Sequence, residues 1–192
     1  LLSFAAVAFM ARSVMLMLGP ILVALANDFG TSIAVSGQLA AATFVTFGIT
    51  APLVGPISDT YGRRPVLLIG VLLMALGVLG SGAAWSYGSL MATRFITGVG
   101  LAMLPPTIMA ALADNLPPEK LGKAVGFIHS ASWVGVALGV PAIALLGYIG
   151  GWRLPFYITG GLSLALWMPL YLSLPSGQRR LGQRVSEYLE GL

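Results

Sequence analysis

The sequence contains no cysteine and few charges. Only 8% of its 192 residues are Asp, Glu, Lys or Arg, whereas 57% are hydrophobic. Without cysteine, disulfides and thiolate metal sites are excluded. Soluble domains carry about 25% charged residues, so these few charges cannot cover a globule of this size with a hydrated surface. A net charge of +4, scattered along the chain, also argues against a nucleic-acid partner. The composition instead predicts that the partner is a lipid bilayer.

Long stretches of the chain have no charge at all, as in residues 29–58 and 66–93. A helix needs about 20 apolar residues to cross a bilayer, and only helices or closed barrels can do so. The apolar runs are continuous rather than alternating, which favours helices. We therefore predict an all-α polytopic membrane protein with six transmembrane helices. The expected spans are residues 2–25, 34–57, 66–84, 88–112, 122–147 and 153–174.

These spans divide the chain into a six-helix transmembrane bundle, residues 1–175, and a cytoplasmic segment, residues 176–192. Hydrophobic residues of the second segment recur at helical spacing between Arg and Glu, so we expect it to lie along the membrane surface. A disordered linker is the alternative. The chain is already apolar at Leu1, without a basic region or cleavage site. We therefore expect no signal peptide, and a start truncated in or just before the first span.

Basic residues gather on one side of the predicted spans. Seven lie in loops 2–3 and 4–5 and after span six, against Arg153 alone on the other side. Because cytoplasmic loops are rich in Lys and Arg, we expect a multi-pass protein of the cell inner (plasma) membrane with both termini in the cytoplasm. The seven are Arg63, Arg64, Lys120, Lys123, Arg179, Arg180 and Arg184.

The loop between spans two and three has an unusual set of residues. Gly55 is expected to let the second span pack closely on a neighbour, and Asp59 lies where that span ends. Gly62 suits a sharp turn with positive φ. Arg63 and Arg64 can pair with a carboxylate or with carbonyls at a helix end. If these arginines were topology signals only, the glycines and the acid at fixed offsets would have no explanation.

The pattern Gly55-x-x-x-Asp59-x-x-Gly62-Arg63-Arg64 resembles the loop 2–3 signature of the major facilitator superfamily of secondary transporters. Thr60 departs from it, since a basic residue is common there. Other segments are similar to further motifs of the family, and together they cover nearly the whole chain. They are Leu18–Ser32, Arg94–Gly100 with Thr97 in place of Gln, Gly135–Pro141 more loosely, and Gly151–Phe156.

The resemblance implies the N-terminal half of a twelve-helix transporter, built as two inverted three-helix repeats. It also implies that the loop 2–3 charges form a cytoplasmic gate, and that a C-terminal six-helix half is missing from this chain. An acid at the end of span four pairs with the loop arginines in the family. We therefore predict a contact of Asp114 with Arg63 or Arg64, a solvated acid being the alternative.

Arg12 and Arg94 are the basic residues inside predicted spans. An Arg at mid-bilayer costs at least about 2.5–3.5 kcal/mol, so each should face a cavity or a partner. Arg12 lies near the middle of the first span and is a candidate for contacting substrate, unless the truncated start misplaces its depth. Arg94 lies near the outer end of the fourth span. A coupling role is favoured there, and snorkelling to the interface is the alternative.

No Asp or Glu lies deep in any predicted span. A proton-coupled carrier normally has a titratable group in its pathway. The candidates in this chain are Asp28, at the outer end of span one, and His129 in span five, which could titrate near physiological pH. A structural, hydrogen-bonded His129 is the alternative. Span five also carries Gly135 and Gly139, followed by Pro141, a small-residue motif for helix packing.

These observations favour a secondary active transporter of small molecules that works by alternating access, with drug or metabolite efflux as the first expectation. Buried arginines without buried acids also allow an organic-anion uptake carrier. A self-contained six-helix membrane scaffold or assembly partner is the alternative from another class. An enzyme is not expected, since no clustered His, Asp and Glu set and no Ser-His-Asp arrangement is present. No metal or cofactor is expected, apart from coupling to protons.

Overall fold

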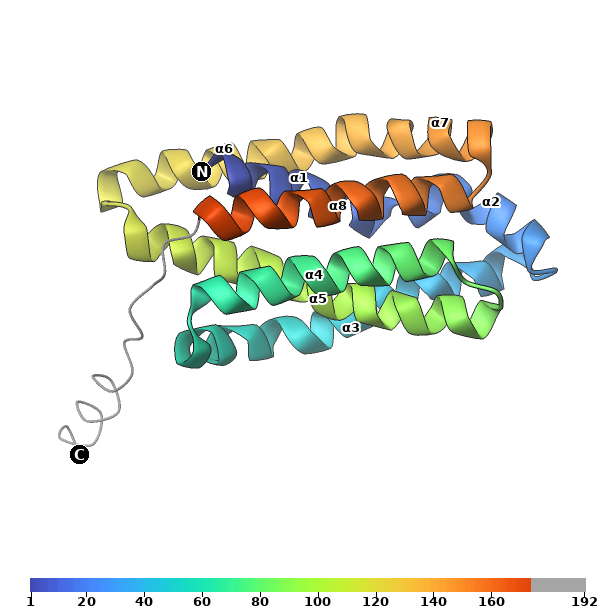
Figure 1. The fold of residues 1–192 in the computed structure, drawn as a ribbon, viewed down its shortest axis with the longest axis horizontal. Helices are drawn as coiled ribbons and strands as arrows, with labels where there is room; N and C mark the ends of the chain where they lie inside the picture. The colour runs from blue at the N-terminus through green and yellow to red at the C-terminus, as the bar shows by residue number, and fades with distance from the viewer. Residues whose placement is uncertain (174–192) are drawn as a thin grey trace.

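The computed structural model describes residues 1–173, and every regular element among them is helical (Figure 1). The first expected span consists of α1 (Leu2–Leu16) and α2 (Leu18–Asp28). The next three are α3 (Ile33–Tyr61), α4 (Arg63–Gly82) and α5 (Tyr87–Asn115). The fifth consists of α6 (Pro118–Val134), the π-helical turn η1 (Gly135–Gly139) and α7 (Val140–Gly150), and the sixth is α8 (Arg153–Ser173). The predicted segment 176–192 lies outside the described residues.

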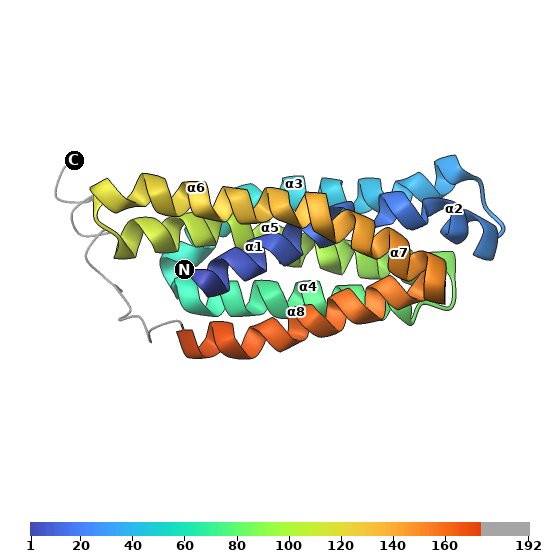
Figure 2. The ribbon, with the colours of Figure 1, turned by 90° about the horizontal axis from the view of Figure 1, so that it is seen from above.

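Five of these segments are long and apolar enough to cross a membrane; they are Leu2–Asp28, Ile33–Tyr61, Arg63–Gly82, Tyr87–Asn115 and Pro118–Gly150. At 1.5 Å per residue, the 20 residues of α4 cover about 30 Å, the thickness of the hydrocarbon core. The sixth segment, α8, has 21 residues and packs along α4 in the same bundle (Figure 2). The predicted all-α bundle of six helical segments is confirmed.

Proline accounts for the irregularities in the first and fifth spans. Pro20 has no N–H to donate to the carbonyl of Leu16, and the first span breaks at Met17 between α1 and α2. In the fifth span, Pro141 cannot donate to the carbonyl of Ala137, which lies within the π-helical turn. Both spans therefore change direction or register part-way across the bundle.

Local sequence also sets where the helices begin and end. The Ser32 side chain accepts a hydrogen bond from the backbone N–H of Val35 at 3.1 Å and caps α3. Ser86 and Ser89 form a reciprocal capping box at the start of α5. Gly62 and Gly151 have φ of +93° and +74° in the tight turns before α4 and α8. A side chain with Cβ would be strained at both turns, so Gly62 has the conformation that was expected of it.

The packing order repeats between the two halves of the chain. Helix α5, from the fourth span, packs against α3 of the second span and α4 of the third. Correspondingly, α1 of the first span packs against α6 and η1 of the fifth span and α8 of the sixth. The third and sixth spans, α4 and α8, pack on each other. Two three-helix repeats produce this arrangement.

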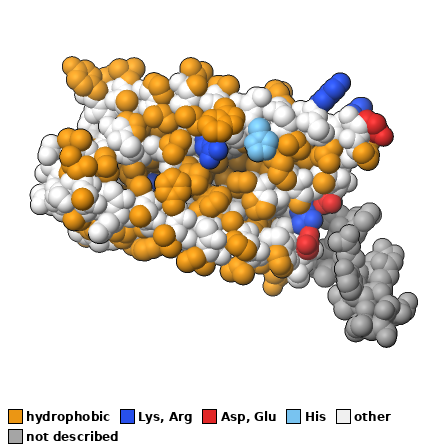
Figure 3. All heavy atoms as spheres, turned by 180° about the vertical axis from the view of Figure 1, so that it is seen from behind, with side chains coloured by type: hydrophobic (Ala, Val, Ile, Leu, Met, Phe, Trp, Pro, Cys, Tyr) orange, Lys and Arg blue, Asp and Glu red, His pale blue; other side chains and the backbone are white. Residues whose placement is uncertain are grey.

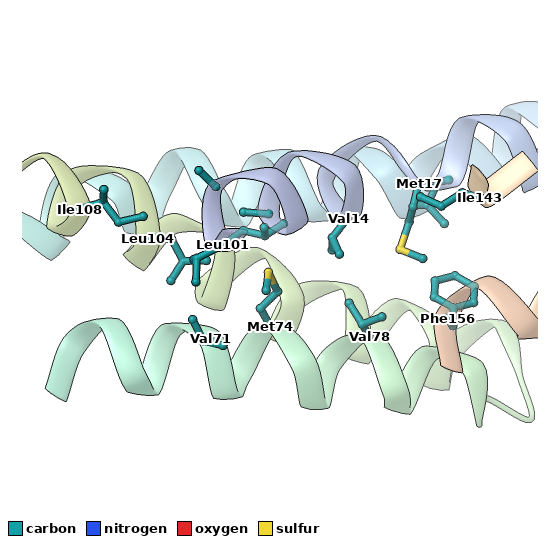
Figure 4. Packing of buried hydrophobic residues seen from close by; sticks show 14 of the residues in the cluster. Val14, Met17, Val71, Met74, Val78, Leu101, Leu104, Ile108, Ile143 and Phe156 are labelled. Carbon is teal, nitrogen blue, oxygen red and sulfur yellow. The ribbon is translucent and has the colours of Figure 1, made fainter. Parts of the chain in front are cut away.

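The core lies between α1–α2 on one side and α4 and α5 on the other (Figure 4). Met17 of the break, Met74 of α4, Leu101 of α5 and Phe156 of α8 are all almost fully buried there. Lipid tails are as apolar as these side chains, so close van der Waals packing, rather than exclusion of water, stabilises such a core in a membrane.

Two segments are much less buried than the rest. Only 17% of the most apolar stretch of α3, and of the fifth span, is buried, against 50 to 56% in the other three candidate spans. Val45, Ile49 and Leu53 project from one exposed side of α3. On the fifth span, Leu138 and Leu145 are exposed. These apolar surfaces require either lipid or further protein against them.

Gly135 and Gly139 let the fifth span approach α1 closely. A Cβ at Gly135 would lie 2.5 Å from the carbonyl oxygen of Phe9, and one at Gly139 would collide with the Ser13 hydroxyl, so the fifth span meets α1 here. By contrast, a Cβ at Gly55 would meet nothing within 4 Å. No neighbour packs on Gly55 among the described residues, so the close packing expected there stays a prediction.

The contact between α4 and α5 is the most extensive in the bundle and provides a test of the packing. A Cβ at Gly100 would collide with the backbone N of Met74 and lie 2.8 Å from the carbonyl oxygen of Gly70. Because two backbones meet there, Gly100→Ala should lower the free energy of unfolding by about 1–3 kcal/mol. Thermal unfolding of the full-length protein in detergent would measure it.

Gly161→Ala is the matched control, since a Cβ at this α8 position meets nothing within 4 Å. It should leave stability unchanged or raise it by up to about 1 kcal/mol through helix propensity. Equal unfolding temperatures for the two variants would contradict the close approach of α4 and α5.

Candidate functional site

Arg63 is the centre of a charged cluster at one end of the bundle, the end that contains the turn at Gly62. Its Nη2 lies 2.6 Å from Oδ1 of Asp59, and its Nε donates to Oδ2 of Asp114 at 3.1 Å. Its Nη1 donates to the Ser58 hydroxyl at 2.6 Å. The predicted contact between Asp114 and a loop arginine is therefore present, and the arginine is Arg63.

Three helix ends create this cluster. Asp59 lies in the last turn of α3, Arg63 is the first residue of α4, and Asp114 is the next-to-last residue of α5. The side chain of Arg63 is 24% exposed, whereas those of Asp59 and Asp114 are 60% and 55% exposed. One guanidinium thus ties three helix ends together with two carboxylates that water can reach. Such a cluster can hold this end of the bundle in one arrangement and can also release it.

Arg64 makes a different connection at the same end. Its Nη2 donates to the backbone carbonyl of Tyr171 at 3.0 Å, and its guanidinium lies 4.7 Å from the centre of the Tyr171 ring. It therefore joins the start of α4 to the last turn of α8. This is the pairing with carbonyls at a helix end that the sequence suggested for the two arginines.

Asp28 lies at the opposite end and is not an isolated titratable group. Its Oδ2 accepts a 3.4 Å contact from Nη1 of Arg153, and Arg153 also donates to the carbonyl of Ala84 at 3.2 Å. This pair was not expected from the sequence. A signal was available, because an Arg follows a turn glycine at the start of both spans, directly in Gly62-Arg63 and after one residue in Gly151-Trp152-Arg153. In the two repeats, Asp28 and Asp114 end equivalent spans, and Arg153 and Arg63 begin equivalent spans.

Arg94 is buried inside the bundle with a relative exposure of 1%. Its guanidinium donates to the hydroxyls of Ser81 and Thr97, with the shortest contact at 2.5 Å, and lies 5.1 Å from the centre of the Phe156 ring. Its Nη1 also lies 3.8 Å from the sulfur of Met17 at the break of the first span. No acid pairs with it among the described residues. Arg94 therefore does not snorkel, since α1, α4 and α8 enclose it.

Arg12, the other basic residue within a span, is half-buried on α1 and borders an open face. Its guanidinium lies 5.1 Å from the centre of the Trp133 ring, a cation–π contact between α1 and α6. The Trp133 side chain is 62% exposed. No acidic partner of Arg12 occurs in the part of the chain that the structure describes. An exposed aromatic ring beside an uncompensated cation is a suitable arrangement for binding an anion with a ring.

His129 lies one turn before Trp133 on the same side of α6 and is exposed. Among residues 1–173 it has no hydrogen bond, so the alternative of a hydrogen-bonded structural histidine is not supported. Figure 3 shows the bundle from behind, with the histidine and basic side chains on a mostly hydrophobic face. Within the described residues no group of three His, Cys, Asp or Glu side chains could hold a metal ion.

Almost the whole chain is similar to known proteins of one family. Residues 2–187 match the model of the Major Facilitator Superfamily. The chain is 33% identical over 135 residues to the 3-(3-hydroxy-phenyl)propionate transporter of Escherichia coli, covering 69% of this chain and 32% of the relative. It is 31% identical over 164 residues to the 4-hydroxybenzoate transporter PcaK of Pseudomonas aeruginosa, covering 85% and 37%.

Other similarities agree in fold and in extent. An uncharacterized MFS-type transporter of Bacillus subtilis, YybF, is 25% identical over 173 residues, covering 90% of this chain and 43% of the relative. The crystal structure of a D-xylose-proton symporter superposes with a TM-score of 0.81 at 19% identity, covering 99% of this chain and 51% of the symporter. The chain thus spans less than half the length of these curated relatives. It is a multi-pass membrane protein, and it belongs to the Major Facilitator Superfamily.

Proposed function

We propose that this chain is the N-terminal half of a secondary active transporter that moves a small organic anion by alternating access. The observation that carries the anion part is Arg12, which lies within a membrane span, borders an open face and has no acidic partner among the described residues. An unpaired cation at membrane depth is costly unless it meets a counter-charge or a water-filled cavity. A substrate carboxylate would provide that counter-charge.

Trp133 supports an aromatic substrate. Its exposed ring lies beside the Arg12 guanidinium, so a carboxylate could contact the cation while a ring stacks near the indole. Two of the relatives are named as transporters of aromatic acids, 3-(3-hydroxy-phenyl)propionate and 4-hydroxybenzoate. Together these observations favour the organic-anion alternative over drug efflux, for which the described residues offer no particular support.

The missing C-terminal half is proposed to cover the exposed sides of α3 and of the fifth span. These are the least buried candidate spans. Trp133 belongs to the fifth span, and its partner Arg12 lies on α1, which packs against that span. We place the Arg63 end in the cytoplasm, because Arg63, Arg64, Lys120 and Lys123 gather there. The Arg63 cluster would then stabilise one state of the cycle at that end. A self-contained scaffold would leave these apolar sides facing lipid.

Substitution of Arg12 tests the proposal. In the purified full-length protein, Arg12→Met should weaken the binding of 4-hydroxybenzoate about tenfold, because a charge-assisted hydrogen bond is lost while the side-chain volume is largely kept. Equilibrium binding of radiolabelled 4-hydroxybenzoate and of the uncharged 4-hydroxybenzyl alcohol would measure it, and Arg12→Lys should restore part of the affinity. Equal loss for the acid and the alcohol would contradict recognition of a carboxylate.

A further inference from the structure

An apolar groove lies between α1, α6 and α8, towards the Arg63 end of the bundle. Its volume is about 670 Å³. Its lining includes Phe9 of α1, Phe127 and Val134 of α6, and Leu162 and Ala165 of α8. Several of these side chains are open to the outside, with Phe127 43% exposed and Leu162 53% exposed. In Figure 1 the start of α1 lies between α6 and α8, and these three helices line the groove.

The groove lies on a different side of α6 from the proposed substrate face. At about 100° per residue, Phe127, Ser130 and Val134 share one side of the helix, whereas His129 and Trp133 share another. The groove also opens between α6 and α8, and α8 makes no substantial contact with α3. A second half that covers α3 and the Trp133 side would therefore leave the groove facing lipid.

A basic residue continues the line of the groove towards the membrane surface. Lys123 lies four residues before Phe127 and seven before Ser130, so it shares their side of α6. It is exposed and has no ion pair among the described residues. Glu119 lies one turn earlier without pairing to it, and Lys120 is exposed beside Glu119. The apolar groove is thus followed, one turn nearer the start of α6, by a positive charge that has no ion pair among the described residues.

We propose that this groove binds one acyl chain of an anionic phospholipid, whose phosphate contacts Lys123. An almost wholly apolar groove in a membrane-embedded face accepts a lipid tail without burying an unpaired polar group. The acyl chains of zwitterionic and anionic lipids are alike, so the groove alone does not distinguish these lipids. Selectivity for an anionic headgroup comes from Lys123, because basic residues near the membrane surface attract anionic lipids. The proposal depends on membrane insertion and on this geometry, and not on the substrate or on the transport cycle.

Photo-crosslinking tests the proposal in the full-length protein reconstituted in nanodiscs. The probe is phosphatidylglycerol with a diazirine in one acyl chain, and phosphatidylcholine with the same tail is the comparison. We expect phosphatidylglycerol to label peptides 2–10, 127–134 and 162–166, and Lys123→Gln to reduce that labelling about fivefold. Lys123→Arg should restore it. Equal labelling by both lipids, or no effect of Lys123→Gln, would overturn the proposal.

A second variant blocks the tail rather than the headgroup. Ala165→Phe fills the groove from α8, and Leu164→Phe adds an aromatic ring one residue away, outside the groove lining. Labelling should fall several-fold in the first variant and remain in the second. Crosslinks from the groove to the second half, or to residues that precede Leu1, in place of lipid would also overturn the proposal. Because Lys123 is exposed, its variants keep the test valid even if Ala165→Phe does not fold.

Discussion

Replacing Arg63 with Gln in the full-length protein is expected to slow transport about 30-fold without preventing membrane insertion. The guanidinium holds Asp59, Asp114 and the Ser58 hydroxyl together. Its loss leaves two carboxylates from different helix ends close together without the cation that contacts both. Hydrogen bonds to charged groups contribute about 1.5–3 kcal/mol, and about 2 kcal/mol taken from one state of the cycle changes its population about 30-fold.

The measurement is the initial rate of uptake into proteoliposomes at matched protein content. Glu119→Gln is the control, since it neutralises an exposed residue in the first turn of α6 that has no ion pair among the described residues. Asp59→Asn should give an intermediate rate, because Arg63 keeps Asp114 and Ser58. Wild-type rates in both Arg63→Gln and Asp59→Asn would rule out a gating role for this cluster.

Two substitutions of Arg94 should separate the contribution of its side-chain volume to stability from the contribution of its charge. Arg94→Ala is expected to lower the free energy of unfolding by about 3 kcal/mol, because it leaves a cavity among α1, α4, α5 and α8. Arg94→Met should stay within about 1 kcal/mol of wild type, since a buried cation without an acid contributes little net stability. Ser81 and Thr97 would retain their bonds to the carbonyls of Gly77 and Thr93. Thermal unfolding of the two variants in detergent measures the difference.

The methionine variant also tests the coupling role predicted for Arg94. If the charge couples substrate to protons, Arg94→Met should fold normally, lose transport and flatten its pH dependence. Leu104→Met, a volume-conserving change at a fully buried position on the same helix, controls for repacking. Unchanged substrate affinity and an unchanged pH profile in Arg94→Met would reject coupling and leave a packing role alone.

Much of the fold follows from where charges are missing. The charge-free stretch 29–58 runs from the end of α2 through most of α3, the stretch 66–93 runs from α4 into α5, and Gly62 and Gly151 lie in the turns before α4 and α8. The Asp114–Arg63 contact was also predictable, although through family resemblance rather than from spacing. These successes share a cause. Bilayer thickness fixes the length of a span, and a glycine with positive φ marks a turn, so both signals are local in sequence.

The features that sequence reasoning missed depend on which helices meet. Asp28 and Arg153 are 125 residues apart and pair only because α2 and α8 meet at one end of the bundle. Arg94 was predicted near the outer end of its span, close to the membrane surface. Its burial depends on the helices that surround it rather than on its position along α5. Neither outcome can be read from helical periodicity, which says nothing about the neighbour on each side.

Arg12 has no acidic partner among residues 1–173, and this has a consequence for the electrical behaviour of the proposed carrier. If Arg12 binds the substrate carboxylate as proposed, the empty site carries one positive charge within the membrane, whereas the site loaded with a monocarboxylate is neutral. Moving one elementary charge across the whole membrane changes its electrical energy by about 2.3 kcal/mol per 100 mV. A charge that crosses only part of the field changes its energy by the corresponding fraction. Through this residue, the voltage would act on the return of the empty carrier and leave the loaded step unaffected.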